Sequence, residues 1–143
     1  MWFHEHPYPP YIPENTTRLI VGTLPPPRFS TGDLNCQDVD FCYRSSNEML
    51  WKIWDRLYDL NLDFENTNHA IEQRKAFLKR ERFGICDIVG GAYRDKIDAL
   101  DLRMQDVQLR DVLSILEQYP KVDRLIFTGG NSENGPEYFY INS

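Results

Sequence analysis

The chain of 143 residues has the length of one domain, and we treat residues 1–143 as a single domain. Its net charge of −6 argues against a broad basic face that holds nucleic acid, although a local basic patch is compatible with it. No run approaches about 18 apolar residues and the start resembles no signal peptide, so we expect no membrane span and no signal peptide. Three cysteines without CxxC spacing indicate a reducing cytoplasm and predict no zinc or iron–sulfur site.

Short apolar strands and amphipathic helices alternate along the chain. Four prolines between positions 7 and 13 forbid a regular helix at the start, so residues 1–17 are expected to form an extended arm. Hydrophobic periodicity then predicts further elements in this order: a strand at 18–22, loops over 23–44, a helix from Ser46 to about Leu60, a helix over about 68–82, a strand at 83–91, a helix marked by Leu109, Val112, Leu113 and Leu116, and a strand at 122–130.

Strands separated by helices imply right-handed crossovers and a mostly parallel sheet covered on both faces. The predicted fold is therefore a three-layer α/β/α domain with a short central sheet. Ligands of such sheets bind beyond the carboxyl ends of the strands. The segments to search for a site are 22–27, 87–94 and 128–135.

The helix entrance in "FCYRSSNEMLWKIWD", residues 41–55, carries more polar and aromatic residues than a helix start needs. Ser45 and Glu48 have the spacing of a capping box, which explains both without any function. Leu50, Ile53, Trp54 and Leu57 recur at helical spacing and are expected in the core. Phe41 and Tyr43 are either core residues or a stacking platform, and the Asn47 amide is expected to project from the helix end.

Polar residues near the other strand ends allow two interpretations each. The loop "GTLPPP" after the first strand lacks the lysine of a P-loop, so it is either a stiff connector or a rigid wall beside a flat ligand. Asp87 follows an apolar strand and needs partners, either a loop backbone or a ligand in a pocket. Asn131 belongs either to a plain turn or to a ligand site. His4 and His6 show no metal-ligand spacing and are expected to face solvent.

Four segments in the same order resemble the uracil-DNA glycosylase superfamily, most of all its bacterial branch near the mismatch-specific and hypoxanthine-DNA glycosylases. The strand and loop "LIVGTLPPP" is similar to the first family motif, and "FCYRSSNEMLWKIW" resembles the helix start that follows it. "FLKRERFGICDIV" and "VDRLIFTGG" resemble the second and third strands. The resemblance extends over most of residues 4–140.

This resemblance implies a DNA repair hydrolase that flips a damaged base out of DNA and cleaves its N-glycosidic bond, without metal or cofactor. The expected substrate base is deaminated, either uracil or hypoxanthine. The family motifs imply that Asn47 or Glu48 positions the water. They also imply that the base is bound by residues of the loops and strand ends, namely Gly22, Thr23, Leu24, Pro25, Phe41 or Tyr43, Asp87 and Asn131.

The chain also departs from the family pattern. Thr23 and Leu24 stand where many members carry a water-activating Asp or Asn, and no second motif is present in residues 131–143. We therefore expect the C-terminal part of the fold, including its last strand, to be missing. Catalysis is then in question, and the alternative is an inactive member that binds a nucleobase, a nucleotide or a protein. The third strand is expected to be an exposed edge, which a homodimer would cover.

Overall fold

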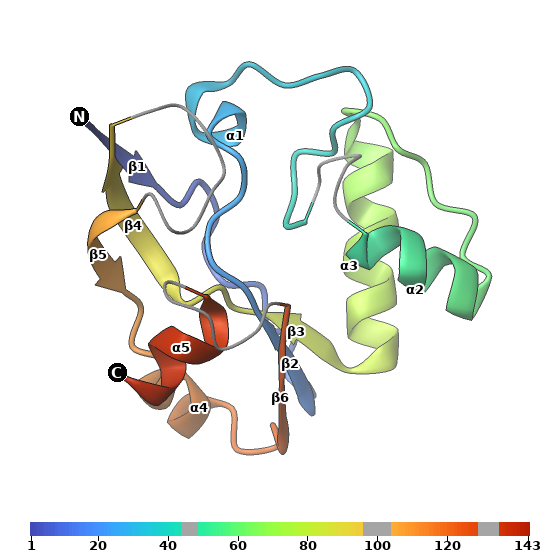
Figure 1. The fold of residues 1–143 in the computed structure, drawn as a ribbon. Coiled ribbons are helices and arrows are strands. Elements are labelled where there is room, and N and C mark those ends of the chain that lie inside the picture. The colour runs from blue at the N-terminus through green and yellow to red at the C-terminus, as the bar shows by residue number, and fades with distance from the viewer. Residues whose placement is uncertain (44–48, 96–103, 129–134) are drawn as a thin grey trace.

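The computed structural model describes residues 1–43, 49–95, 104–128 and 135–143. Its described elements are β1 (Trp2–Glu5), β2 (Arg18–Val21), α1 (Arg28–Thr31), α2 (Leu50–Tyr58), α3 (Asn68–Glu81), β3 (Phe83–Ile85), β4 (Val89–Arg94), β5 (Gln105–Leu109), α4 (Val112–Gln118), β6 (Arg124–Phe127) and α5 (Pro136–Ile141). They form two three-stranded sheets flanked by helices (Figure 1). No helix among these elements is long and apolar enough to cross a bilayer.

The parallel sheet has β2 at its centre, between β3 and β6. Successive side chains of a strand point to opposite faces, and β2 follows this rule. Ile20 packs into a core with α2 and α3, whereas Leu19 and Val21 pack into a second core that includes residues of α4 and α5. Figure 1 shows these helix pairs on the two sides of the sheet. The predicted three-layer α/β architecture with parallel strands is thus confirmed.

The aromatic residues of α2, α3 and β3 form the first core. Trp54 lies 5.1 Å from Phe77 and 4.8 Å from Phe83 between ring centroids, and Trp51 packs against Trp54 at 4.8 Å. Of the four residues of α2 predicted for the core, Trp54 is buried and Leu50 packs partly buried against this core, whereas Ile53 is 49% and Leu57 is 72% exposed, so the prediction was wrong for these two. The buried face turns instead toward Trp51, because the two indoles have the larger apolar surfaces. The proposed capping box of Ser45 and Glu48 lies outside the described residues.

The helix predicted over about 68–82 is confirmed as α3. Thr67 caps its start by accepting a hydrogen bond from the Ala70 amide, and Arg82 ends it in a left-handed conformation. The helix is rich in basic residues, of which Arg74 is fully buried and lies over the rings of Trp51 and Phe64. One face of this basic helix therefore belongs to the core.

The antiparallel sheet, with the order β1-β4-β5, was not predicted. The apolar run at 83–91 divides into β3 and β4, with Asp87 between them, and Leu109 ends β5 instead of starting a helix. β1 pairs with β4, and the amide and carbonyl of Tyr11 bond to Ile85. These pairings hold the N-terminal arm against the body of the domain, so His4 and His6 are buried and the expectation that they face solvent was wrong.

Candidate functional site

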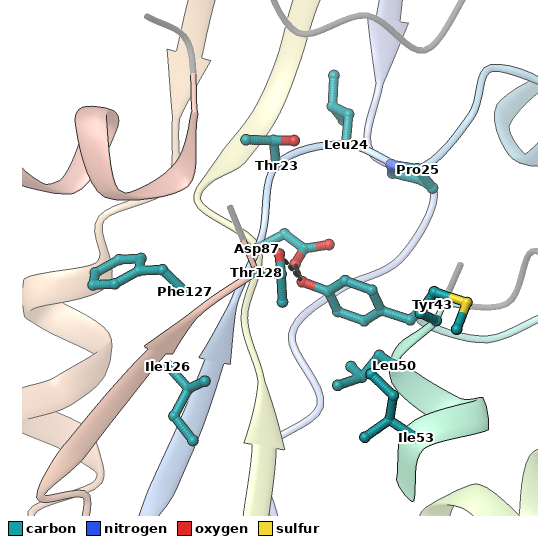
Figure 2. Close-up of a pocket in the computed structure, with 11 residues that line it drawn as sticks. Thr23, Leu24, Pro25, Tyr43, Leu50, Ile53, Asp87, Ile126, Phe127 and Thr128 are labelled. Atoms are coloured by element: carbon teal, nitrogen blue, oxygen red, sulfur yellow. Dashed lines mark hydrogen bonds between the residues drawn. The ribbon is translucent and has the colours of Figure 1, made fainter. Parts of the chain in front are cut away.

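A cavity of about 460 Å³ opens where β2 and β6 end and α2 begins. This volume lies within the range of small-molecule sites. Apolar side chains of α2 and β6 form two of its walls, and polar groups gather between them (Figure 2). The lining residues are Thr23, Leu24, Pro25, Tyr43, Met49, Leu50, Ile53, Asp87, Ile126, Phe127 and Thr128.

The carboxylate of Asp87 is the most constrained polar group of the cavity. Its Oδ1 accepts hydrogen bonds from the Gly22 amide at 3.0 Å and the Tyr43 hydroxyl at 2.8 Å. Its Oδ2 lies 2.8 Å from His6 Nε2, and the residue is only 7% exposed. Asp87 is placed there because the chain leaves β3 beside β2, where the Ile88 amide bonds to the Gly22 carbonyl at 2.8 Å. Three donors thus satisfy a carboxylate that burial alone would penalise.

The tautomer of His6 follows from its second contact. The backbone amide of Tyr8 donates to His6 Nδ1 at 3.1 Å, so Nδ1 carries no proton. The ring proton is therefore on Nε2, which donates to Asp87 Oδ2. A neutral imidazole from the N-terminal arm consequently orients the carboxylate at the cavity.

Gly22 permits the close approach of three side chains at the end of β2. A Cβ at this position would overlap the Tyr43 hydroxyl and lie 2.8 Å from both Asp87 Oδ1 and Thr128 Oγ1. The Tyr43 hydroxyl also lies 3.2 Å from Thr128 Oγ1, and the Thr128 amide donates to the Val21 carbonyl at 3.0 Å. Figure 2 shows the Tyr43 ring extending across the cavity toward Asp87 and Thr128. Only glycine fits beneath this contact.

The structure brings together five of the sequence-predicted binding residues, which are Thr23, Leu24, Pro25, Tyr43 and Asp87. Gly22 contacts this group, because its amide donates to Asp87 Oδ1. Phe41 is 6% exposed and packs edge-on against Tyr11, so it occupies the core, which was one of its two predicted places. Asn47, Glu48 and Asn131 lie outside the described residues.

Sequence reasoning missed His6, Thr128 and the apolar walls of the site. Thr128 begins one of the searched segments, and Leu50 and Ile53 were assigned to the core from their helical spacing. The face of α2 that the spacing marked does line the cavity, so an apolar stripe next to a predicted strand end was the available signal. Within the described part of the chain, no three His, Cys, Asp or Glu side chains are grouped so as to hold a metal ion.

These features define an α/β/α protein with a small-ligand cavity at the carboxyl ends of its parallel strands. No family model matches the chain. A hypoxanthine DNA glycosylase from Methanosarcina barkeri is 24% identical over 125 residues, which cover 87% of this chain and 71% of that protein. The solution structure of a Methanosarcina acetivorans protein, provisionally assigned as a uracil DNA glycosylase, superposes with a TM-score of 0.68 at 20% identity, covering 98% of this chain and 76% of the other.

The sequence comparison and the structural comparison point to the same group of proteins. The predicted resemblance to DNA glycosylases of the uracil-DNA glycosylase type is therefore confirmed, and the chain shares the fold of the Methanosarcina acetivorans structure.

Proposed function

We propose that the chain acts on DNA as a glycosylase-like protein that removes a deaminated base, uracil or hypoxanthine, by hydrolysing its N-glycosidic bond. The observation that carries this proposal is the cavity of about 460 Å³ at the strand ends, with Asp87 and Tyr43 among its lining residues. A planar base inside it would have apolar walls on two sides and hydrogen-bonding groups at its edge. The similarity to a hypoxanthine DNA glycosylase supports the choice of reaction.

The reaction requires that the base leave the DNA stack, because the bond to be cleaved and the base edge are inaccessible inside a duplex. Tyr43 would then stack on the flipped base, and the hydroxyls of Thr23 and Thr128 are within the same cavity. A water oxygen bonds to C1′ of the deoxyribose while the C1′–N bond breaks. The bonding electron pair leaves with the base, which finally takes up a proton from the water.

We assign the positioning of this water to Asn47 or Glu48. Both precede Met49 and Leu50 in the sequence, and these two residues line the cavity. A carboxamide or a carboxylate can orient a water molecule by accepting one of its protons in a hydrogen bond. No other part of this proposal depends on which of the two residues acts.

A glycosylase assay on oligonucleotides that contain uracil, hypoxanthine or xanthine tests the proposal. We expect abasic sites, revealed by alkaline strand cleavage, in at least one of the first two substrates. Asn47→Ala and Glu48→Ala separate the candidates for the water-positioning role, and Glu117→Ala on the exposed surface of α4 serves as the matched control. Absence of abasic sites with both the uracil and the hypoxanthine substrate would contradict the proposal, whatever happens with xanthine. Base binding without cleavage would favour the alternative of an inactive binding module.

We also propose that a second copy of the chain covers the free side of β6. Among the described strands β6 is at an edge of the parallel sheet, and Ile126 on it is 40% exposed. An exposed strand edge is a site for pairing with another chain. The molecular mass measured by sedimentation for the wild-type chain and for Ile126→Lys tests the dimer.

Location in the cytoplasm stays a prediction from cysteine usage.

A further inference from the structure

The edge of the parallel sheet at which its strands begin carries a cluster of basic side chains. β2, β3 and β6 run in the same direction, so the segments 14–18, 79–82 and 121–124 meet at this edge (Figure 1). Thr17 joins all three, because its amide donates to the Arg82 carbonyl at 2.9 Å and its carbonyl accepts from the third segment at 2.9 Å. We call this cluster the basic edge, and its members are Arg18, Lys79, Arg80, Arg82, Lys121 and Arg124.

The basic edge has an excess of positive charge in a chain whose net charge is −6. The same three segments contain only three acidic residues, Glu14, Glu81 and Asp123. Within the described part of the chain, the one ion pair of the basic edge joins Arg80 to Glu81 at 3.0 Å. Arg82, Lys121 and Arg124 are exposed and form no ion pair with any described residue, so their charges are available to a ligand.

The carboxyl end of α3 explains only part of this cluster. Cations are favourable near the carboxyl end of a helix, which accounts for Lys79 and Arg80 in the last turn of α3. Arg18 and Arg124 begin strands, so a helix end gives no reason for their charges. The two residues are register partners on neighbouring strands, where like charges destabilise a sheet. An anion bound between them would remove this repulsion.

The composition of the basic edge fits phosphate groups. None of the exposed large hydrophobic residues in the described part of the chain belongs to its three segments. Protein interfaces have apolar cores and few lysines, whereas Lys and Arg make many of the contacts to the phosphates of nucleic acids. A surface of cations without apolar neighbours is therefore suited to a phosphate backbone, which it binds regardless of base sequence.

The basic edge lies at the opposite end of the sheet from the cavity. β2 and β6 have four residues each, so the first and last Cα atoms of each strand are about 10 Å apart at about 3.3 Å per residue. The cavity opens beyond the last residues of these strands, whereas the cations surround the first ones. We propose that the basic edge is a second nucleic-acid site, which binds the phosphate backbone of a DNA segment other than the one at the cavity. It rests on the proposed function only for the choice of DNA.

The salt dependence of DNA binding tests this site. Fluorescence anisotropy with the full chain and a short undamaged duplex gives the association constant between about 50 and 200 mM salt, and its logarithm falls linearly with the logarithm of the salt concentration. For Lys121→Gln and for Arg124→Gln we expect weaker binding and a slope reduced by about 0.9 for the one charge removed. Lys121→Arg and Arg124→Lys keep the charge and should retain the wild-type slope. Arg56→Gln is the matched control and should also retain it, because exposed Arg56 shares a surface depression with Asp55 and Asp59.

Hydrolysis of a short duplex that contains uracil or hypoxanthine separates the two sites. With a different DNA segment at each site, both Gln variants should keep the wild-type KM for this substrate. A KM that rises as much as the Kd for the undamaged duplex would show that one segment contacts both ends of the sheet, and would overturn the inference. An unchanged salt slope in the Gln variants would overturn it as well. Equally strong displacement of the duplex by poly-L-glutamate would do the same, since it would indicate an acidic protein as the partner.

The two measurements keep this inference distinguishable from the proposed function. If neither damaged duplex is cleaved, the proposed function fails, and the salt slope of the undamaged duplex alone decides on the basic edge. If cleavage occurs and the salt slope of the Gln variants equals that of the wild type, the proposed function stands and the second site does not exist.

Discussion

His6 donates a hydrogen bond to Asp87 over 2.8 Å, although 81 positions of the chain separate the two residues. The contact exists because β1 pairs with β4, and the His6 amide bonds to the Gly90 carbonyl at 2.8 Å. One residue of the arm thereby reaches the point where β3 ends. The N-terminal arm thus contacts a carboxylate that lines the cavity, so a change in the docking of the arm should alter the position of Asp87.

Gly22→Ala should damage both stability and the site. The added methyl group would overlap the Tyr43 hydroxyl and crowd Asp87, so the two side chains must move apart. Overpacking of this kind costs about 1–3 kcal/mol of unfolding free energy. Urea denaturation measures the loss, and base-binding calorimetry should show weaker binding. Gly90→Ala is the control, because its Cβ would meet neighbours at an ordinary 3.5 Å. Equal stability of the two variants would refute the crowding argument.

Tyr43→Phe separates the hydroxyl of Tyr43 from its ring. The variant keeps the aromatic face for a base but removes the donor to Asp87 at 2.8 Å. We expect a loss of about 1.5–3 kcal/mol in unfolding free energy, because a hydrogen bond to a charged group is removed. Base binding should decline less than in Tyr43→Leu, which removes the ring as well. Tyr93→Phe on the exposed side of β4 is the control and should leave the denaturation midpoint unchanged.

The parallel sheet could be predicted because two of its strands are short continuous apolar runs, "RLIV" and "RLIF", as is typical of parallel sheets. The antiparallel sheet could not. Its strand β5 has the sequence "QDVQL", in which only Val107 is half-buried, and β1 lies in a proline-rich arm. Backbone pairing with β4 holds both strands, and such pairing leaves no hydrophobic period in either sequence.

Only part of the site could be predicted from the sequence, as was the case for the fold. A carboxylate after an apolar strand needs partners, and Asp87 has both of its predicted kinds of environment, a loop amide at Gly22 and a cavity. His6 could not be recognised, since its place depends on the unpredicted pairing of β1 with β4. Its neighbours Glu5 and Pro7 give no local indication of burial. Long-range docking is therefore what sequence reasoning lacked.

Trp54→Ala and Leu57→Ala test which residues of the apolar stripe on α2 are buried. Trp54 contacts three aromatic rings in the core, and its truncation should cost about 3–5 kcal/mol of unfolding free energy. Leu57 is 72% exposed, so its truncation should cost less than about 0.5 kcal/mol. Both values come from denaturant titration followed by circular dichroism. A large loss of unfolding free energy for Leu57→Ala would show that Leu57 is buried, as its helical spacing predicted.

His4 should make the stability of the protein depend on pH. Burial, followed by the charge of Arg94, lowers the pKa of His4 from 6.5 to about 4. Between pH 6.5 and 4, His4 therefore binds a proton in the unfolded chain but not in the folded chain. The contribution of neutral His4 to the unfolding free energy is fully present above pH 6.5. It is lost as the pH decreases through this window, with a slope of up to about 1.4 kcal/mol per pH unit.

Two histidine variants isolate this contribution in the same titration. His4→Asn can accept the hydrogen bond that Arg94 Nε donates at 2.9 Å to His4 Nδ1, but it does not titrate. The difference in unfolding free energy between pH 7 and pH 4 should therefore shrink in this variant. His69→Asn removes a largely exposed imidazole and should leave the difference unchanged. If His4→Asn keeps the full pH dependence of the unfolding free energy, another group causes that dependence, and His4 contributes nothing to acid destabilisation.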